Sequence, residues 1–325
     1  MDKALAYKPQ MEFDLGKGHN SSVAVPDFVN AKPFVKWVGG KSQLIPALIA
    51  RFPSFLDYSS TTYIEPFVGG GALFFWLVSH GRKFKKTILN DANPSLINVY
   101  RTIRDMPEKL IEILTDIKDE YLSLNNEERK IFYYEKRNAF NSGTDTPVEH
   151  SAHFIFLNRT CFNGLYRVNS KGKFNVPHGR YDNPLICDPE TIRADSYALA
   201  DVEIRCGDFS KAVEASDEHC FIYFDPPYRP LSETSCFCSY CTGGFDDDEQ
   251  QRLAKCCSTL DAQGAQWLLS NSDPKSLCPN DDFFEHIYRG FHIHSVQANR
   301  MLNSNPTKRG KLSELLISNY LVTGV

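Results

Sequence analysis

The sequence predicts an α/β fold: a mostly parallel sheet with an antiparallel hairpin at one edge and a helical subdomain inserted between two of its strands. Short apolar segments that are typical of buried strands alternate with helical segments along the 325-residue chain. Such alternation favours a parallel sheet with helices on both faces. The last two strand-like segments, 286–298 and 313–322, have little between them, which indicates the antiparallel edge pair.

The predicted elements of the sheet follow in order along the chain. The strands are 61–67, 85–91, 202–209, 220–227 and 265–271, followed by the edge pair. The helices between them are 71–81, 211–216 and 245–264. Gly81 suits the end of the first helix because glycine adopts the left-handed backbone that commonly terminates helices. The acids at the start of the third helix suit the positive end of its dipole.

Three parts are predicted along the chain. They are a polar, poorly ordered N-terminal extension (1–30), an α/β domain (31–93 and 202–325) and an inserted subdomain (94–201). Within the insertion, 96–124 and 148–160 have helical periodicity. The segment 167–181, RVNSKGKFNVPHGRY, predicts a hairpin around Lys171 and Gly172.

The composition indicates a cytoplasmic enzyme with reduced thiols. No apolar run is long enough for a signal peptide or a membrane span. The formal net charge is -4, so any basic surface for nucleic acid must be local. In the cluster of Cys236, Cys238 and Cys241, the last two form one CxxC pair, and a structural metal site would need a second pair such as Cys256 and Cys257. Their irregular spacing favours ordinary thiols, and no metal is expected.

A glycine-rich turn follows the first predicted strand. In IEPFVGGGALFF, Phe67, Gly69 and Gly71 lie between a strand and a helix, where glycines permit a tight turn and let a ligand approach the backbone. The pattern is neither the dinucleotide fingerprint nor a P-loop. Asp91 ends the next strand, where an acid can accept hydrogen bonds from ribose hydroxyls. Together these residues fit an adenosyl ligand, although the turn alone is equally typical of a structural connection.

The tetrapeptide Asp225-Pro226-Pro227-Tyr228 follows the fourth predicted strand, where open α/β sheets bind ligands. The prolines stiffen the loop and remove N–H donors. The Asp225 carboxylate and the Pro226 carbonyl then form two acceptors that suit an NH₂ group, and Tyr228 can stack on a planar ring. The structural alternative is a strand-ending turn with an exposed acid, and the upstream glycine turn and Asp91 argue against it.

Two segments carry basic residues without any acid. The first, 151–181, contains Arg159, Arg167, Lys171, Lys173 and Arg180, and the second, 300–311, contains Arg300, Lys308, Arg309 and Lys311. Basic surfaces of this kind suit contacts with phosphates. A solvated hairpin is the structural alternative for the first segment.

In these motifs and their order, the sequence resembles the D12 class of adenine-N6 DNA methyltransferases, of the Dam type and the α group. Within it, the sequence is similar to the GATC methylases of Dpn-type restriction–modification systems. The resemblance covers residues 32–323. Its matching stretches are KWVGGK, EPFVGGGALFF, LNDAN, NRTCFNGLYRVNSKGKFNVPHGRY, GDF, YFDPPYRPLSETS and RGKLSELLISNY. The N-terminal extension has no counterpart in that pattern.

The resemblance implies a Rossmann-like methyltransferase fold that binds S-adenosylmethionine and methylates the N6 amine of a flipped-out adenine in double-stranded DNA, within GATC. The residues implied in cofactor binding are Trp37, Lys41, Phe67, Gly69, Gly71, Asp91, Asp208 and Asp225. Those implied in catalysis are Asp225, Pro226 and Tyr228. Those implied in DNA reading are Lys36, Phe162, Asn163, Leu165, Arg167, Pro177 and Tyr181.

Two alternatives to this function stay open. Methylation of cytosine N4 or of RNA is disfavoured, because cytosine-N4 enzymes usually carry serine where Asp225 stands and RNA enzymes rarely carry this insertion. A DNA-binding protein of the same fold, with another recognition site or without catalysis, is the second. The expected partner is DNA, with no membrane and no obligate protein partner, for a monomer in the cytoplasm of a bacterium, acting at the nucleoid, or encoded by a phage.

Overall fold

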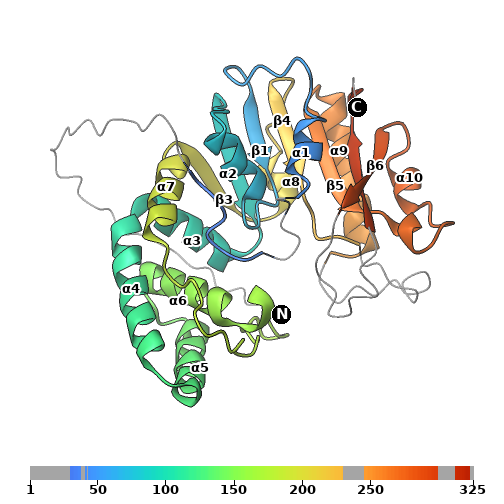
Figure 1. The fold of residues 1–325 in the computed structure, drawn as a ribbon. Coiled ribbons are helices and arrows are strands. Elements are labelled where there is room, and N and C mark those ends of the chain that lie inside the picture. The colour runs from blue at the N-terminus through green and yellow to red at the C-terminus, as the bar shows by residue number, and fades with distance from the viewer. Residues whose placement is uncertain (1–29, 38–40, 42, 230–244, 299–311, 323–325) are drawn as a thin grey trace, which may run out of the picture.

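The computed structural model describes residues 30–37, 41, 43–229, 245–298 and 312–322 (Figure 1). The predicted N-terminal extension lies outside the described residues apart from Asn30. The basic segment 300–311 and the cysteines at 236, 238 and 241 also lie outside them.

One seven-stranded sheet forms the centre of the structure, in the order β3-β2-β1-β4-β5-β7-β6. Its strands are β1 (Thr62–Glu65), β2 (Lys86–Asp91), β3 (Val202–Cys206), β4 (Cys220–Phe224), β5 (Gln266–Ser272), β6 (His292–Ala298) and β7 (Leu312–Ser318). The pairs among β1 to β5 are parallel, whereas β7 pairs antiparallel with both β5 and β6. The predicted fold class is therefore confirmed, including its antiparallel edge.

Helices cover both faces of this sheet because side chains alternate along each strand. Tyr63, Phe221 and Leu268 pack on one face with α1 (Ile45–Ile49) and α2 (Ala72–Ser79). Ile64, Ile222 and Trp267 pack on the other face. The helices on that face are α8 (Phe209–Ala212), α9 (Asp247–Ala262) and α10 (Phe283–Ile287). All five residues of β4 are buried, which explains its uninterrupted apolar sequence.

The segment between β2 and β3 is largely helical, and α4, α5 and α6 gather at one side of the sheet (Figure 1). Its helices are α3 (Pro94–Asp105), α4 (Pro107–Ser123), α5 (Asn126–Ser142), α6 (Pro147–Thr160) and α7 (Pro189–Leu199). A single hydrophobic cluster runs from the sheet residue Leu89 through Tyr100 and Leu114 to Phe156. The apolar core of the insertion is thus continuous with that of the sheet.

The structure corrects several predicted boundaries. The helix predicted over 96–124 is two helices that separate at Pro107, since proline has no N–H to continue the hydrogen-bond ladder. The strand predicted over 286–298 begins only at His292, because the preceding residues form α10 and Gly290 turns the chain with φ +97°. The short helix predicted over 211–216 is instead α8, which starts at Phe209 after its capping residue Asp208.

The hairpin predicted over 167–181 is a tight turn with little ladder. Gly172, at φ +71°, donates its N–H to the Asn169 carbonyl across 2.9 Å. One isolated antiparallel bridge joins Val168 to Phe174. The turn is where the sequence predicts it, but regular strands do not flank it. Within the described ranges, no helix is long and apolar enough to cross a membrane.

Candidate active site

The predicted cofactor-binding and catalytic residues cluster around the carboxyl ends of the parallel strands β1 to β4. The strand order reverses here, since β2 and β3 follow β1 on one side and β4 and β5 lie on the other. A crevice at such a switch point is the usual ligand site of open α/β sheets. Glu65 ends β1, Asp91 ends β2 and Asp225 directly follows β4.

The glycine turn after β1 is held by its neighbours rather than open on all sides. Gly69 and Gly71 adopt left-handed backbones with φ +49° and +69°. A Cβ atom at Gly69 would lie 2.8 Å from Nε1 of Trp37, and one at Gly71 would lie 2.6 Å from the Tyr100 hydroxyl. Any side chain at these positions would therefore clash. The sequence predicts close approach by a ligand, and the close neighbours in the structure are Trp37 and Tyr100.

Asp91 ties this turn to the end of β2. Its carboxylate accepts hydrogen bonds from the N–H of Gly69, at 3.1 Å, and from the N–H of Asn93, at 2.9 Å. Burial raises the pKa of Asp91, while these backbone donors oppose the rise. Each carboxylate oxygen can accept more than one hydrogen bond, so Asp91 can still receive the hydroxyls of a sugar.

An aromatic cluster lies beside the turn. The Phe67 ring centroid is 5.2 Å from that of Phe209 and 5.5 Å from that of Phe245. Asp208, next to Phe209, caps α8 and pairs with both terminal nitrogens of Arg252, at 2.9 and 2.7 Å. The hydrogen bond from Arg252 holds the pKa of Asp208 well below its ordinary value. Flat apolar rings suit the base of a nucleoside, and carboxylates beside them suit a ligand that also carries a positive charge.

Asp225 is the centre of the polar corner after β4. Its Oδ1 lies 3.0 Å from Nζ of Lys41 and accepts a hydrogen bond from Ser270 at 2.9 Å. The Asp225 side chain is 23% exposed and that of Lys41 is 7% exposed. Burial raises the pKa of Asp225, and the Lys41 ammonium counteracts it.

Tyr228 faces the same corner. Nζ of Lys41 lies 4.2 Å from the Tyr228 ring centroid. The Tyr228 hydroxyl donates a hydrogen bond of 2.6 Å to Oε2 of Glu314, a buried residue of β7. The structure thus brings together Lys41, Asp225 and Tyr228, as the resemblance implies, and adds Glu314 from the antiparallel edge.

A buried amide pair clamps the loop that carries this tetrapeptide. Gln250 donates to the Pro227 carbonyl at 3.0 Å, and Asn271 donates to Gln250 at 3.0 Å. Both amide residues are fully buried. Arg229 pairs with Asp247 and Asp281 at the end of the loop. These contacts fix the loop from α9 and β5, in addition to the stiffness of its prolines.

Glu65 is a buried carboxyl near Asp225. It accepts a hydrogen bond from the Tyr63 hydroxyl at 2.6 Å. Burial, with a smaller contribution from the charge of Asp225, raises the pKa of Glu65 to about 8. Burial therefore favours the protonated form of Glu65, which limits the negative charge concentrated at the switch point.

The predicted DNA-reading residues lie along the loop 162–181 of the insertion, apart from Lys36, which contacts that loop. Phe162 is 52% exposed, and its N–H donates to the Pro177 carbonyl at 2.8 Å. Asn163, with φ +56°, donates its N–H to the Tyr181 hydroxyl at 3.0 Å. Nζ of Lys36 lies 4.8 Å from the Tyr181 ring centroid. A left-handed asparagine is a strained feature of the kind that clusters at functional sites.

The remaining DNA-reading candidates lie along the same loop. Leu165 donates its N–H to the Phe162 carbonyl at 3.3 Å and is partly buried. Arg167 is exposed, and its Nε donates to Asn175 at 2.8 Å. Arg159 differs from the predicted basic surface, because its guanidinium turns inward and donates to the Phe34 carbonyl at 2.7 Å. Four of the five basic side chains of 151–181 thus remain exposed.

Sequence reasoning missed several residues of this site. They are Glu65, Gln250, Arg252, Ser270, Asn271 and Glu314. Arg252, Ser270 and Glu314 form hydrogen bonds with Asp208, Asp225 and Tyr228. The other three support the same region, through Pro227 for Gln250, through Gln250 for Asn271 and through its charge interaction with Asp225 for Glu65. Polar residues inside apolar strand sequences are the available signal, since a buried polar side chain needs a partner. Glu314 in SELLIS and Ser270 in WLLSN fit this signal.

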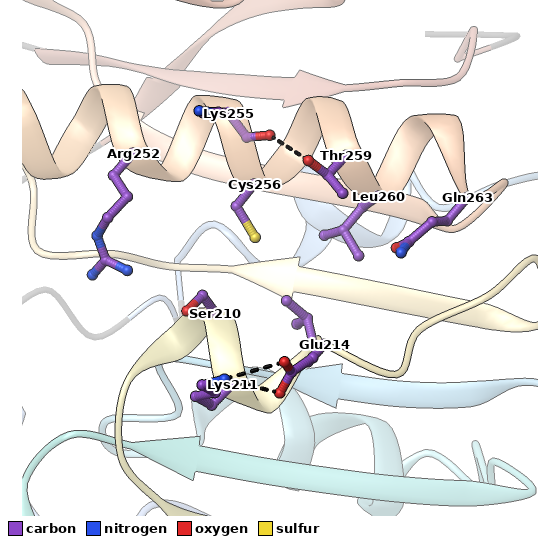
Figure 2. A pocket seen from close by; sticks show the side chains of 10 residues that line it. Ser210, Lys211, Glu214, Arg252, Lys255, Cys256, Thr259, Leu260 and Gln263 are labelled. Atoms are coloured by element: carbon purple, nitrogen blue, oxygen red, sulfur yellow. Dashed lines mark hydrogen bonds and ion pairs between the residues drawn. The ribbon is translucent and has the colours of Figure 1, made fainter.

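A separate groove of about 440 Å³ lies between α8 and α9 (Figure 2). Arg252 and Lys255 line it from α9, and Lys211 and Glu214 from the α8 side, where they pair with each other at 3.1 Å. None of the predicted site residues lines this groove. It borders the active-site region through Arg252 and Ser210, which both form hydrogen bonds with Asp208.

The family model for D12 class N6 adenine-specific DNA methyltransferase matches residues 37–302 of this sequence. The chain belongs to the D12 class of N6 adenine-specific DNA methyltransferases. This D12 enzyme therefore transfers methyl groups to adenine N6 in DNA, and the corner formed by Asp225 and Tyr228 lies within its matched region.

Relatives cover nearly all of this methyltransferase. It is 47% identical over 296 residues to the type II methyltransferase M.MjaIII of Methanocaldococcus jannaschii, covering 90% of this chain and 100% of the relative. It is 41% identical over 297 residues to the type II methyltransferase M1.LlaDCHI of Lactococcus lactis subsp. cremoris, covering 90% and 96%. It is 35% identical over 286 residues to a DNA adenine methylase of Haemophilus influenzae, covering 88% and 92%.

Proposed function

We propose that this methyltransferase modifies the adenine of GATC in double-stranded DNA, with S-adenosylmethionine as methyl donor and Asp225, Pro226 and Tyr228 holding the flipped-out base. One observation carries the proposal. A single nitrogen, Nζ of Lys41, lies 3.0 Å from the Asp225 carboxylate and 4.2 Å from the Tyr228 ring centroid. An N–H donor therefore meets an acceptor and an aromatic face together, which is the environment that an adenine amine and its ring require.

The cofactor would lie between the glycine turn and the polar corner. S-Adenosylmethionine, when bound, supplies a methyl group on a sulfonium centre. The residues that we assign to hold it are Trp37, Lys41, Phe67, Gly69, Gly71, Asp91, Asp208 and Asp225. Asp91 would accept the ribose hydroxyls and Phe67 would contact the flat adenine. The acids at the ends of β2 and β4 and the phenylalanine cluster support this assignment.

The chain's own residues prepare the adenine amine for reaction. The N6 lone pair is delocalised into the ring, so the amine is a poor nucleophile. Hydrogen bonds from its two hydrogens to Asp225 and the Pro226 carbonyl favour a pyramidal nitrogen with a localised lone pair. Asp225 thus places and polarises the amine rather than acting as a strong base. The hydrogen bond from Gln250 to the Pro227 carbonyl helps to hold these two acceptors in fixed positions.

The insertion would read the DNA and extrude the base. Flipping an adenine out of the duplex costs a few kcal/mol, and stacking on Tyr228 offsets part of that cost. Phe162 is exposed and can fill the space that the base leaves, with Asn163 contacting the orphaned thymine. Arg167 can bind guanine O6 and N7, while Lys36 reads the other outer pair, and Leu165, Pro177 and Tyr181 complete the surface.

The biological setting follows as part of the proposal. Residues 31–93 and 202–325 would form the catalytic domain and 94–201 the recognition subdomain, acting as a monomer on DNA in the cytoplasm. The relatives named as type II methyltransferases support a role in restriction–modification.

A methyl-transfer assay on matched duplexes tests this function. Radiolabelled methyl groups should enter a duplex with one GATC, and should not enter the same duplex with both GATC adenines already N6-methylated or with GATC scrambled. Equal incorporation into the scrambled duplex would contradict the GATC assignment. Binding to DNA without incorporation into any duplex would instead favour the inactive DNA-binding alternative.

A further inference from the structure

Two adjacent residues, Lys36 and Trp37, contact two different functional loops. Trp37 packs on the glycine turn, where a Cβ at Gly69 would lie 2.8 Å from its Nε1. Lys36 packs on the DNA-reading turn, where a Cβ at Gly164 would lie 2.6 Å from the Cβ of Lys36. Consecutive residues of one irregular segment therefore touch the proposed cofactor pocket and the proposed DNA surface.

Both side chains also contact aromatic residues of the loop 162–181. The Trp37 ring stacks on Tyr166, with centroids 5.9 Å apart and an interplanar angle of 23°. The Lys36 ammonium lies over the ring of Tyr181, whose hydroxyl accepts the N–H of Asn163 at 3.0 Å. A shift of the Lys36–Trp37 backbone would consequently disturb both loops.

The side chain of Asn158, in α6, fixes that backbone. Its Oδ1 accepts the N–H of Lys36 at 2.8 Å, and its Nδ2 donates to the Lys36 carbonyl at 2.8 Å and to the Gly164 carbonyl at 3.0 Å. Asn158 is 2% exposed. One buried amide thus uses its acceptor and both its donor hydrogens to join the Lys36 backbone to the DNA-reading turn.

Other contacts hold the start of this segment without reaching the turn. The guanidinium of Arg159 donates to the Phe34 carbonyl at 2.7 Å, and the N–H of Lys32 donates to Asp195 at 3.0 Å. These contacts secure residues 32–34 on α6 and α7. The bond from Asn158 to Gly164 is of a different kind, since it connects the segment to the turn that carries Phe162 and Asn163.

We propose that Asn158 is a positioning residue that couples cofactor binding to sequence-specific DNA binding, through the Lys36–Trp37 backbone and the Gly164 carbonyl. The inference rests on the proposed function. A ligand that orders Trp37 also orders Lys36 and the turn, so the second ligand has less ordering to impose. The coupling is reciprocal, because each ligand must change the affinity for the other by the same factor.

The test measures the affinity for a GATC duplex with and without saturating S-adenosylhomocysteine, which carries no methyl group to transfer. The wild-type protein is expected to bind the duplex about fivefold or more tightly in its presence. In Asn158→Ala this factor should fall below about twofold. The coupling weakens because alanine removes the amide acceptor and both amide donors that join Lys36 to Gly164. The affinity for S-adenosylhomocysteine, measured with and without DNA, should show the same reduced factor.

Asn141→Ala is the matched control. The Asn141 amide makes the same pair of bonds to one backbone residue, accepting the N–H of Phe174 at 2.8 Å and donating to its carbonyl at 2.9 Å. It lies in the same insertion, and both of these bonds go to Phe174 rather than to the Lys36–Trp37 segment. Its loss should change DNA affinity equally with and without S-adenosylhomocysteine, so that the coupling factor stays at the wild-type value.

The possible results distinguish failure of the coupling from failure of the proposed methyltransferase function. If Asn158→Ala does not fold, Asn158→Asp, which keeps the volume and the acceptor for Lys36, takes its place and should also lower the factor. A wild-type factor near one, or an unchanged factor in the Asn158 variant, overturns the inference while methyl transfer to GATC persists. Absence of methyl transfer by the wild-type protein overturns the proposed function and the inference with it.

Discussion

The Tyr228 hydroxyl donates a 2.6 Å hydrogen bond to Glu314, across 86 residues of sequence. The bond joins the loop after β4 to the antiparallel strand β7, and Glu314 is buried. Because an aromatic platform must be held in one orientation to stack productively on a base, the carboxylate on β7 contributes to the geometry of the proposed base-binding corner. The antiparallel part of the sheet therefore also supports this corner.

Glu314→Ala should lower kcat for a GATC duplex by about tenfold, which corresponds to the loss of roughly one hydrogen bond. Glu314→Gln is the matched variant, since its amide oxygen can still accept from Tyr228, and it should keep kcat within about threefold of wild type. Steady-state kinetics and thermal melts of both variants check this. Equal kcat values in the two variants would mean that the Tyr228 contact does not position the ring.

Arg167→Ala should relax recognition of one outer base pair. Arg167 is exposed and can form two hydrogen bonds with guanine, so its removal should cost about 1–3 kcal/mol of discrimination at that position. Rates on duplexes with each base pair of GATC replaced in turn measure it. Lys171→Ala, at the exposed tip of the same turn, should weaken binding to all duplexes alike. An unchanged site preference in Arg167→Ala would reject the assignment.

Glu65→Gln should change how stability depends on pH. In the folded protein the pKa of Glu65 rises from 4.5 to about 8, so folding retains a proton that the unfolded chain releases. This stabilisation is complete below pH 4.5, is lost as the pH rises toward about 8, and is absent above it. The neutral glutamine does not titrate, so the variant should gain a few kcal/mol relative to wild type between pH 5 and pH 8.

Urea denaturation at pH 5, 6.5 and 8 measures the free energy of unfolding of both proteins. Glu214→Gln, at an exposed carboxylate of the α8–α9 groove, serves as the control. Stability curves of wild type and Glu65→Gln that run parallel across this range would show that Glu65 is ionised in the folded protein.

Much of the fold could be predicted because its strands are short and apolar and end at recognisable turns. CFIYF is buried on every residue, so its pattern leaves little ambiguity. Helix α5 was missed because its buried residues Phe132, Tyr133 and Phe140 lie among many charged ones. The reciprocal hydrogen bonds of Asn125 and Glu128 cap this helix, and their spacing in the sequence was the usable signal.

The candidate site could be predicted only where chemistry lies in a continuous motif. Asp91 ends β2 and Asp225 follows β4, and these strands flank β1 on its two sides, so strand order alone places both acids beside the glycine turn that follows β1. Ser270, Asn271 and Glu314 reach the site from other strands, and their contacts depend on three-dimensional packing. Asn158 belongs to a motif that the resemblance matched, but its bonds to Lys36 span 122 residues, which no local pattern encodes.

The most direct test of the central claim is the single-turnover rate of methyl transfer into a GATC duplex by Asp225→Ala, at saturating cofactor and with cofactor affinity measured on the same sample. Asp225 lies where it can orient the adenine amine, so the rate should fall by about 1,000-fold or more. Cofactor binding should survive with weaker affinity. A rate near that of wild type would contradict the account.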